Sequence, residues 1–381
     1  MRAWRYAALV LVLTLLGACA PTKSARVPLG VDVGWVVSND GSILMTPAVA
    51  AHVAATGAGL ARVEFRTGPF FSGDGPGQCV FTPAICGQRQ QAGWQAFYAA
   101  YDRVVANLAA QHVAVLGLLD YTTVGGGQSL WCANNAEHGL GDGSNPYTAE
   151  FASTAEQVMA HYRGRIRYWE IWNEPNAWTH SSGDAYSGGS FLYPSNYAAL
   201  LEATYRAAVT EHHLPVTIIS GGLFGHSIGN VYSPQNAGAS YLEQVFARWR
   251  AQGLKTYPLD AVGQHLYITQ GGAVTAQQVQ EYLGWVHQVA VSFGAGSLPT
   301  FVTEMGWTDH SVSRPLQAQD LGTALAAARG EPYVDSVVVF NLIGMGYGLY
   351  GSGFTPEPAL ATYQQAAKSW TVPLRAGQPL S

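Results

Sequence analysis

The chain has 381 residues, a formal net charge of −5 and 48% hydrophobic residues. Charged residues make up only 11%, against roughly 25% in typical soluble domains. This balance leaves no basic field for binding nucleic acid. The plentiful Gly, Tyr and Trp residues instead suit a protein that handles neutral, hydroxyl-rich ligands by stacking and hydrogen bonding.

The first residues are expected to form an export signal and no part of the fold. Residues 1–5 carry two positive charges, residues 6–16 are apolar, and Leu-Gly-Ala-Cys ends at Cys19. A basic start, a short apolar stretch and small residues before a cut site are typical of secretory signals. Leu-Gly-Ala-Cys also resembles the bacterial lipobox, which implies removal of residues 1–18 and a lipid on Cys19. The alternative is an ordinary secretory signal, and both place the protein outside the cytoplasm, in the cell envelope or secreted.

Three further cysteines, Cys79, Cys86 and Cys132, follow the signal. An oxidising compartment permits one disulfide among them and leaves one thiol over. Cys79 and Cys86 share a Gly/Pro-rich loop and close the shortest ring, but Cys132 could pair with either. No Cys/His grouping has metal-ligand spacing, so the sequence predicts no metal site.

After a linker at residues 19–28, β-branched runs alternate with alanine-rich helical patterns. The predicted strands are 29–36, 60–66, 113–120, 166–173, 216–221, 259–267, 300–304 and 336–341. The predicted helices are 47–56, 94–111, 148–162, 195–213, 239–252, 276–293, 316–328 and 358–370. Strands that alternate with helices form parallel βαβ units, and eight such units predict a closed barrel. We therefore expect a single (β/α)8 TIM-barrel domain over residues 29–381.

The lengths of the predicted loops show which end of the barrel binds ligands. Helix-to-strand connections are short, whereas the strand-to-helix loops at 67–93, 121–147, 174–194 and 222–238 are long. In TIM barrels the strand-to-helix loops build the active-site face. The binding face is therefore expected at the carboxyl ends of the strands.

Two glutamates end predicted strands at this face. Glu174 closes Trp-Asn-Glu-Pro after the fourth strand, and Glu304 lies in Thr-Glu-Met-Gly-Trp at the end of the seventh. Glycosidic cleavage needs one carboxylic acid to protonate the leaving oxygen and a second carboxylate to attack or to activate water. In a retaining enzyme the two carboxyl groups lie about 5–5.5 Å apart.

Trp-Asn-Glu-Pro and Thr-Glu-x-Gly-Trp at these strand positions resemble the clan A glycoside hydrolases, in particular the cellulase and β-xylosidase families 5 and 39. The resemblance covers essentially the whole chain after the signal. It implies that Glu174 is the acid/base, that Glu304 is the nucleophile, and that Asn173 bonds the sugar 2-hydroxyl.

Two further strands carry motifs of the same clan. The sixth contains His265-Leu266-Tyr267, and side chains two apart on a strand share a face. The resemblance implies that Tyr267 holds the nucleophile and that His265 contacts the substrate. On the second strand, Arg62 matches the clan's Val-Arg pattern and is a candidate for keeping the nucleophile ionised.

The chain departs from the clan at two strand ends. Many members have a tryptophan after the eighth strand, where this chain has Phe340 and Asn341. The third strand ends in Asp120, not in the histidine that several families use. Both differences concern recognition of the sugar, so Asn341 and Asp120 are candidate substrate contacts, although Asp120 could equally be a turn residue.

Other conspicuous residues have structural explanations. Glu170 and Glu64 are expected to form buried ion pairs with arginine, because they lie on strands below the rim. Trp178 and Trp307 lie in rim loops, where a tryptophan is either a platform for a sugar or a core residue that anchors the loop.

These observations predict a retaining glycoside hydrolase that cleaves a β-linked oligo- or polysaccharide without a cofactor. We expect a monomer that binds no nucleic acid and touches the membrane only through its lipid. The alternatives are a non-catalytic glycan-binding lipoprotein on the same barrel and a transglycosylase with the same residues. The sequence does not specify the sugar, the linkage, or endo against exo cleavage.

Overall fold

The structure is a computed structural model, and it describes residues 26–38, 41–67, 83–123, 146–177, 191–225, 233–234, 237–268 and 272–370. The signal segment, Cys19, Cys79, Cys132 and Trp178 lie outside the described residues. Their predicted roles therefore stay predictions.

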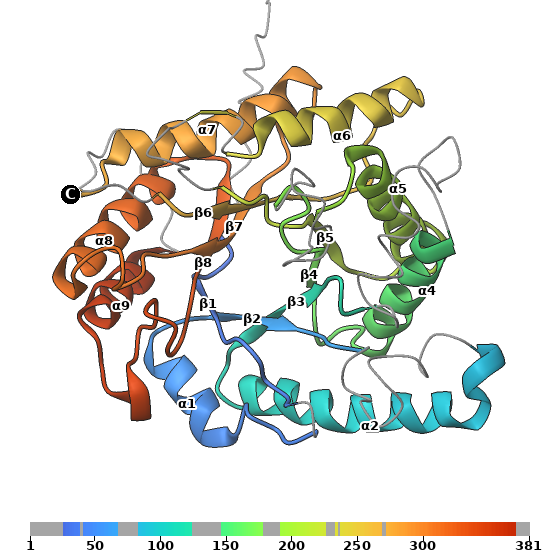
Figure 1. The fold of residues 1–381 in the computed structure, drawn as a ribbon, viewed down its shortest axis with the longest axis horizontal. Helices are drawn as coiled ribbons and strands as arrows, with labels where there is room; N and C mark the ends of the chain where they lie inside the picture. Colours follow the sequence, from blue (N-terminus) through green and yellow to red (C-terminus); the bar gives the residue numbers. More distant parts are fainter. Residues whose placement is uncertain are drawn as a thin grey trace, which may run out of the picture.

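Eight parallel strands form one sheet that curls into a nearly closed barrel, in the order β5-β4-β3-β2-β1-β8-β7-β6 (Figure 1). The strands are β1 (Gly30–Asp32), β2 (Leu60–Glu64), β3 (Ala114–Leu119), β4 (Tyr168–Ile171), β5 (Thr217–Ser220), β6 (Val262–Leu266), β7 (Thr300–Met305) and β8 (Val334–Val339). Parallel bridges at Ile219–Ala261 and Leu223–Gln264 join the β5 edge to the β6 edge. The predicted (β/α)8 TIM barrel is confirmed.

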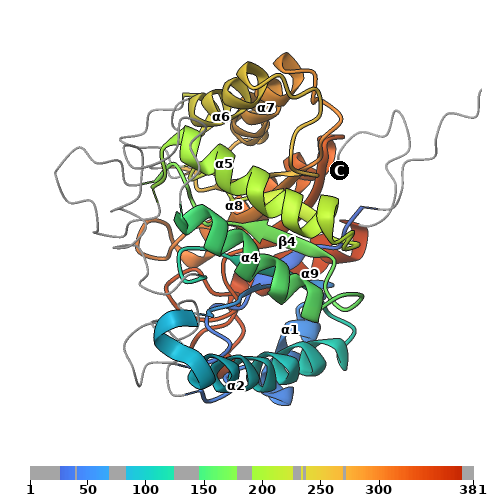
Figure 2. The same cartoon turned by 90° about the vertical axis from the view of Figure 1, so that its right-hand side faces the viewer.

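A ring of helices surrounds the strands (Figures 1 and 2). The helices are α1 (Pro47–Ala55), α2 (Pro83–Ala109), α4 (Pro146–His161), α5 (Pro194–Tyr205), α6 (Ala239–Ala251), α7 (Ala276–Ser292), α8 (Arg314–Gly330) and α9 (Pro358–Trp370), and α5 continues as a π-helical turn over Arg206–Glu211. Side-chain caps mark where three of the helices begin. In the first turn of α1, α7 and α8, a backbone N–H donates to the side chain of Thr46, Thr275 and Ser313, respectively. Among the described residues, no helix is both long and apolar enough to span a bilayer.

One helix begins earlier than the sequence pattern predicts. α2 starts at Pro83 and not near residue 94, so Cys86 belongs to a helix and not to the loop that was expected to hold it with Cys79. Proline fits the first helical turn, where the backbone N–H groups have no partner within the helix. The prediction started the helix near residue 94, where the apolar periodicity begins, and so missed this proline.

Apolar side chains fill the interior of the barrel below the rim. This inner group comprises Leu60, Leu116, Ile219, Ala261, Phe301 and Val338. Because it blocks the axis, the barrel is a packed core with a site at one end, as in other TIM barrels.

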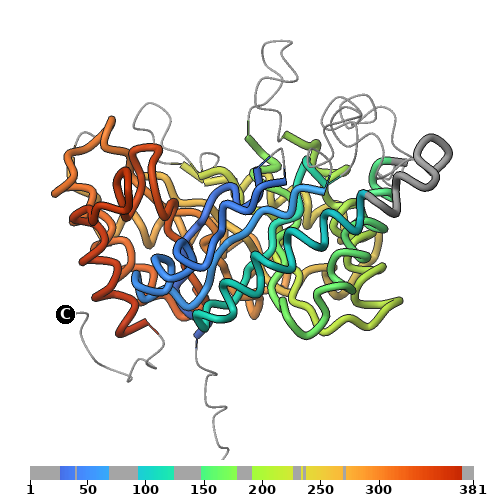
Figure 3. Tube along the Cα trace, turned by 90° about the horizontal axis from the view of Figure 1, so that it is seen from below, coloured from blue at the N-terminus to red at the C-terminus, as the bar shows by residue number. Residues whose placement is uncertain are grey.

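The last helix closes the barrel against its start. The Tyr363 hydroxyl donates to the Gly30 carbonyl oxygen at 2.9 Å, and Trp370 Nε1 donates to the Val27 carbonyl at 3.0 Å. In Figure 3 the red C-terminal helices lie beside the blue start of the chain, in agreement with the pairing of β1 with β8. These contacts fix α9 to β1 and to the segment before it.

Candidate active site

A cavity of about 710 Å³ opens at the carboxyl ends of the strands. Both predicted catalytic residues, Glu174 and Glu304, line it. Its other walls come from β1, β2 and β3 and from the segments after β4 and β8. They include Asp32, Trp35, Arg62, Glu64, Asp120, Tyr121, Asn173, Phe340, Asn341 and Met345. The cavity therefore lies at the face that the loop lengths predicted.

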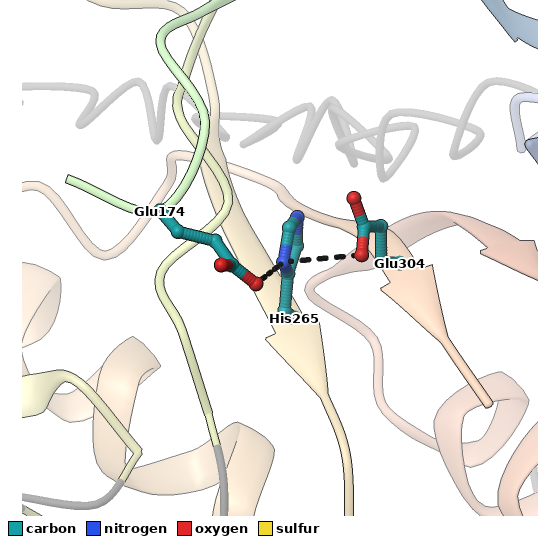
Figure 4. A group of neighbouring side chains, drawn as sticks. All are labelled: Glu174, His265 and Glu304. Carbon is teal, nitrogen blue, oxygen red and sulfur yellow. Dashed lines mark hydrogen bonds and ion pairs between the residues drawn. The ribbon is translucent and has the colours of Figure 1, made fainter. Parts of the chain in front are cut away.

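Glu174 and Glu304 face each other with His265 between them (Figure 4). His265 Nδ1 lies 2.8 Å from Glu174 Oε1 and 3.5 Å from Glu304 Oε2. One oxygen of each glutamate and one nitrogen of the imidazole all lie within 4.8 Å of one another. Such a trio is also close enough to ligate a metal ion, although His265 Nδ1 is already engaged with Glu174.

Two hydrogen-bond donors hold the Glu304 carboxylate. Arg62 Nη1 donates to Oε1 at 2.6 Å, and the Tyr267 hydroxyl donates to Oε2 at 2.5 Å. Both donors are buried, so little water competes for these bonds. The arrangement fixes the carboxylate in one orientation toward the cavity.

Arg62 connects four side chains beneath the cavity. Besides Glu304, its guanidinium donates to Glu170 Oε2 at 2.6 Å, to Asp32 Oδ2 at 2.8 Å and to Asn173 Oδ1 at 2.8 Å. Burial alone would lower the pKa of Arg62, but the surrounding carboxylates outweigh it and raise this pKa well above the ordinary value. The predicted ion pair between buried Glu170 and an arginine is confirmed.

The backbone is strained where β4 ends. Trp172 and Glu174 have φ angles of +76° and +50°, in the left-handed region that non-glycine residues rarely adopt. The Trp172 N–H donates to the Leu119 carbonyl, the Glu174 N–H donates to the Gly222 carbonyl, and the Trp172 ring is fully buried. Packing and hydrogen bonds thus hold a conformation that turns Glu174 toward the cavity, as is common at functional sites.

His265 is fully buried and does not line the cavity. Its closest polar contacts are the two carboxylates, so in this structure it orients the pair and does not touch the space that a sugar would fill. Burial lowers the pKa of His265, but Glu304 and Glu174 outweigh it, and the pKa is raised overall. A Cβ on Gly222 would overlap the imidazole ring, so the close approach of the ring requires glycine there.

The other predicted substrate contacts divide into two groups. Asn173, Asp120 and Asn341 line the cavity, and their contact with a substrate stays a prediction. Trp307 is 1% exposed and donates from Nε1 to the Ile268 carbonyl, so the structure favours the packing role over the sugar platform. In TIM barrels a rim aromatic can serve either role, and only the surrounding contacts separate them.

Several residues of the cavity were not assigned to it from the sequence, among them Asp32, Trp35 and Glu64. Asp32 ends β1, and its strand-end position was the signal that could have identified it. Trp35 is 58% exposed, and the Arg66 guanidinium stacks 4.2 Å from the centre of its ring. Glu64 forms the expected ion pair with an arginine, since Arg66 Nε lies 4.0 Å from Glu64 Oε1, and it also lines the cavity.

No protein-family model and no curated protein matches the chain. Solved structures match its fold. A family 39 glycoside hydrolase from the gut symbiont Bacteroides cellulosilyticus WH2 is similar with a TM-score of 0.58 and 16% identity, over 91% of this chain and 64% of that one. The chain thus spans less than two thirds of that enzyme.

Two further structures are similar over most of both chains. A family 5 glycoside hydrolase variant from Streptomyces cattleya, bound to Manβ1-4GlcNAc, gives a TM-score of 0.63 at 15% identity, over 93% of this chain and 83% of that one. Xylanase 10B from Thermotoga maritima gives 0.54 at 11% identity, over 91% and 95%. The fold is therefore a TIM barrel that resembles those of the clan A glycoside hydrolases.

Proposed function

We propose that this protein is a retaining glycoside hydrolase that cleaves β-linked oligo- or polysaccharides, with Glu304 as the nucleophile and Glu174 as the acid/base. The observation that carries the proposal is the convergence of these carboxylates at the cavity, with oxygens within 4.8 Å of each other. Retaining pairs are separated by about 5–5.5 Å, whereas inverting pairs leave about 6.5–9.5 Å for a water molecule. The short separation favours retention.

The partners of the two glutamates support this division of roles. Glu304 accepts from Arg62 and Tyr267, which leave its carboxylate fixed for attack on the anomeric carbon. The Glu174 carboxyl gives its proton to the leaving oxygen as that C–O bond breaks. In the second step Glu174 takes a proton from water, the water oxygen bonds to the anomeric carbon, and Glu304 leaves.

Two cavity residues suit binding of the sugar. The Asn173 carbonyl oxygen accepts from Arg62, which leaves its NH₂ group as the donor for a sugar hydroxyl. The exposed ring of Trp35 offers an apolar face at the edge of the cavity. Hydrogen bonds and stacking of this kind fit a neutral carbohydrate.

The test is turnover of a panel of aryl β-glycosides by the wild-type protein and by Glu304→Ala. We expect turnover of at least one substrate, its loss in Glu304→Ala, and no change in Glu243→Gln, which alters an exposed carboxylate on α6. Binding of oligosaccharides without turnover of any substrate would support the glycan-binding alternative. Transfer products in place of free sugar would support a transglycosylase.

We also propose that the protein acts in the bacterial cell envelope as a monomer, without a cofactor, and is anchored by a lipid on Cys19. The basis is the lipobox-like sequence before Cys19. Cys19→Ala should release the protein from the membrane fraction and leave the catalytic constants unchanged. An unchanged membrane-bound fraction would contradict the lipid anchor.

A further inference from the structure

A second group of acidic side chains lies in the same cavity, on the side of β2 and β3. Glu64 ends β2 and Asp120 directly follows β3, and both line the cavity. The register of the two strands sets Glu64 opposite Leu118, so the two carboxylates are neighbours at the rim. Neither has a part in the proposed reaction.

These carboxylates have few hydrogen-bond donors. Thr122 gives its N–H and its hydroxyl to Asp120 Oδ1, both at 2.8 Å. The hydroxyl has a single hydrogen, so its 3.4 Å contact with Glu64 Oε1 receives no bond of its own. Within the described part of the chain, neither Asp120 Oδ2 nor Glu64 Oε2 accepts a hydrogen bond.

The cation beside the two carboxylates, Arg66, forms an ion pair with Glu64 and stacks on Trp35. The Arg66 Nε–Glu64 Oε1 distance of 4.0 Å is too long for a hydrogen bond. Arg62 already makes four hydrogen bonds with its five N–H groups, to Glu170, Asp32, Glu304 and Asn173. The β2–β3 side of the cavity thus offers acceptors and negative charge with hardly any donor.

Asn341 supplies an independent sign of a missing ligand. It lines the cavity, is 4% exposed, and its buried Oδ1 accepts no hydrogen bond from the described residues. A buried acceptor without a partner is unfavourable by about 1–3 kcal/mol unless a ligand or water supplies the donor. The wall of the cavity that follows β8, which is separated from β2 by β1 alone, therefore also requires a donor.

We propose that Glu64, Asp120 and Asn341 form a subsite that selects a sugar unit carrying a protonated amino group. This inference rests on the proposed function for its biological meaning, because the subsite shares the cavity of the catalytic pair. A protonated amine has three N–H donors, no acceptor and a positive charge, which complements two carboxylates and an amide oxygen. A sugar hydroxyl supplies one donor and no charge.

The protonation state of the subsite agrees with this complementarity. Burial and the neighbouring Asp120 raise the pKa of Glu64 to about 8. These two effects outweigh the nearby Arg66 and Arg62, which lower the pKa of Glu64. An ammonium group would take the place of the proton on Glu64, with its release to solvent.

Binding of sugars that cannot be hydrolysed tests the inference without any turnover. Calorimetry with the wild-type protein at about pH 6, where an aliphatic amine is protonated, would compare glucosamine, glucose and N-acetylglucosamine. We expect glucosamine to bind roughly tenfold more tightly than the other two. Equal affinities, or tighter binding of either neutral sugar, would overturn the inference.

Two variants link the preference to the subsite. Glu64→Gln and Asp120→Asn replace a carboxyl group, which can bind the ammonium as a carboxylate, with an amide of the same shape, and each should lower the preference for glucosamine severalfold. Glu243→Gln removes an equal charge from an exposed position and should not alter it. A preference that survives in both subsite variants would place the amine elsewhere, and if a variant does not fold, the wild-type comparison still decides.

The inference and the proposed function can fail separately. A preference for glucosamine without turnover of any glycoside would retain the subsite and reject the glycosidase. Turnover of neutral glycosides with no preference for glucosamine would retain the glycosidase and reject the subsite.

Discussion

The cavity contains two groups of carboxylates that differ in their partners more than in their positions. On the side of β4, β6 and β7, Glu304 is held by Arg62 and Tyr267, and Glu174 by His265. On the side of β2 and β3, Glu64 and Asp120 share one threonine and keep oxygens without donors. Both groups end strands at the same rim.

This difference indicates what each group is suited to do. A carboxylate that must attack or transfer a proton needs a fixed orientation, which buried donors supply. A carboxylate that binds a ligand needs unoccupied acceptors that the ligand fills. Proximity to the cavity therefore does not separate catalytic from binding acids, whereas the count of donors does.

Removal of either proposed catalytic carboxylate should have the largest effect. Glu304→Gly should lower turnover of every substrate by about 10⁴-fold or more, because no group remains to attack the anomeric carbon. Azide should partly restore cleavage from the vacated side and give an α-azide. Glu174→Ala should spare dinitrophenyl glycosides in the first step, because their leaving group needs no proton.

Product stereochemistry then separates the two roles. With Glu174→Ala the glycosyl-enzyme should accumulate, and azide should attack it to give a β-azide. Chromatography and proton NMR of the azides provide the measurement. An α-azide from the Glu174 variant would exchange the roles of the two glutamates. If azide rescued neither variant, the assignment of nucleophile and acid/base would have to be abandoned.

A methyl group at Gly222 should disturb the catalytic side through His265. The Cβ of Gly222→Ala would overlap the imidazole ring, which has to move away from Glu174. A shift of about 1 Å in a catalytic group can lower turnover roughly 10²-fold, so we expect a fall in kcat with little change in KM. Gly272→Ala is the matched control, since a Cβ there meets no atom within 4 Å. Equal activity of the two variants would show that His265 does not orient the pair.

The hydrogen bond from Tyr267 to Glu304 should have a smaller effect. Tyr267→Phe keeps the ring and removes the hydroxyl donor. A hydrogen bond to a charged group contributes about 1.5–3 kcal/mol, so kcat/KM should fall roughly 10- to 100-fold. Tyr347→Phe changes a neighbouring ring that packs edge-on against Tyr267. In this control, kcat/KM should fall much less. Similar losses in both variants would reduce the role of Tyr267 to packing.

The smallest expected effect is on stability and concerns the binding side. The pKa of Glu64 rises from 4.5 to about 8, so the folded protein keeps a proton that the unfolded chain releases in this range. Stability contributed by this proton is therefore lost as the pH rises through the window. Glu64→Gln should raise the free energy of unfolding more at about pH 8 than at about pH 5, by roughly 1–3 kcal/mol. Urea unfolding that shows the same change at both pH values would contradict this titration.

Much of the fold followed from periodicity in the sequence. All eight strands lie where β-branched runs alternate with helical patterns, because each parallel strand is buried on both faces and reads as a continuous apolar run. The start of α2 at Pro83 was missed, since its first turns lack the apolar periodicity on which the prediction depended. The rim position of Glu174 and Glu304 followed from the ends of the strands.

The contacts that give the site its chemistry were harder to predict. Glu64 stands between Arg62 and Arg66 in sequence, which suggested an ion pair but not its partner. The pair forms with Arg66, at 4.0 Å, whereas Arg62 turns to Glu170. The partner of a buried cation depends on strands that are distant in sequence. Trp307 was ambiguous for the same reason, because only the Ile268 carbonyl reveals that its ring anchors the core.

The most direct test of the central claim is to trap the covalent intermediate. A 2-deoxy-2-fluoro glycoside with an activated leaving group, matched to the best substrate of the panel, should inactivate the wild-type protein. The fluorine destabilises the oxocarbenium-like transition states of both steps, and the activated leaving group speeds only the first. Peptide mass spectrometry should then locate one sugar on the peptide that contains Glu304. A label on Glu174, or steady turnover with inversion at the anomeric carbon and no label, would contradict the proposed mechanism.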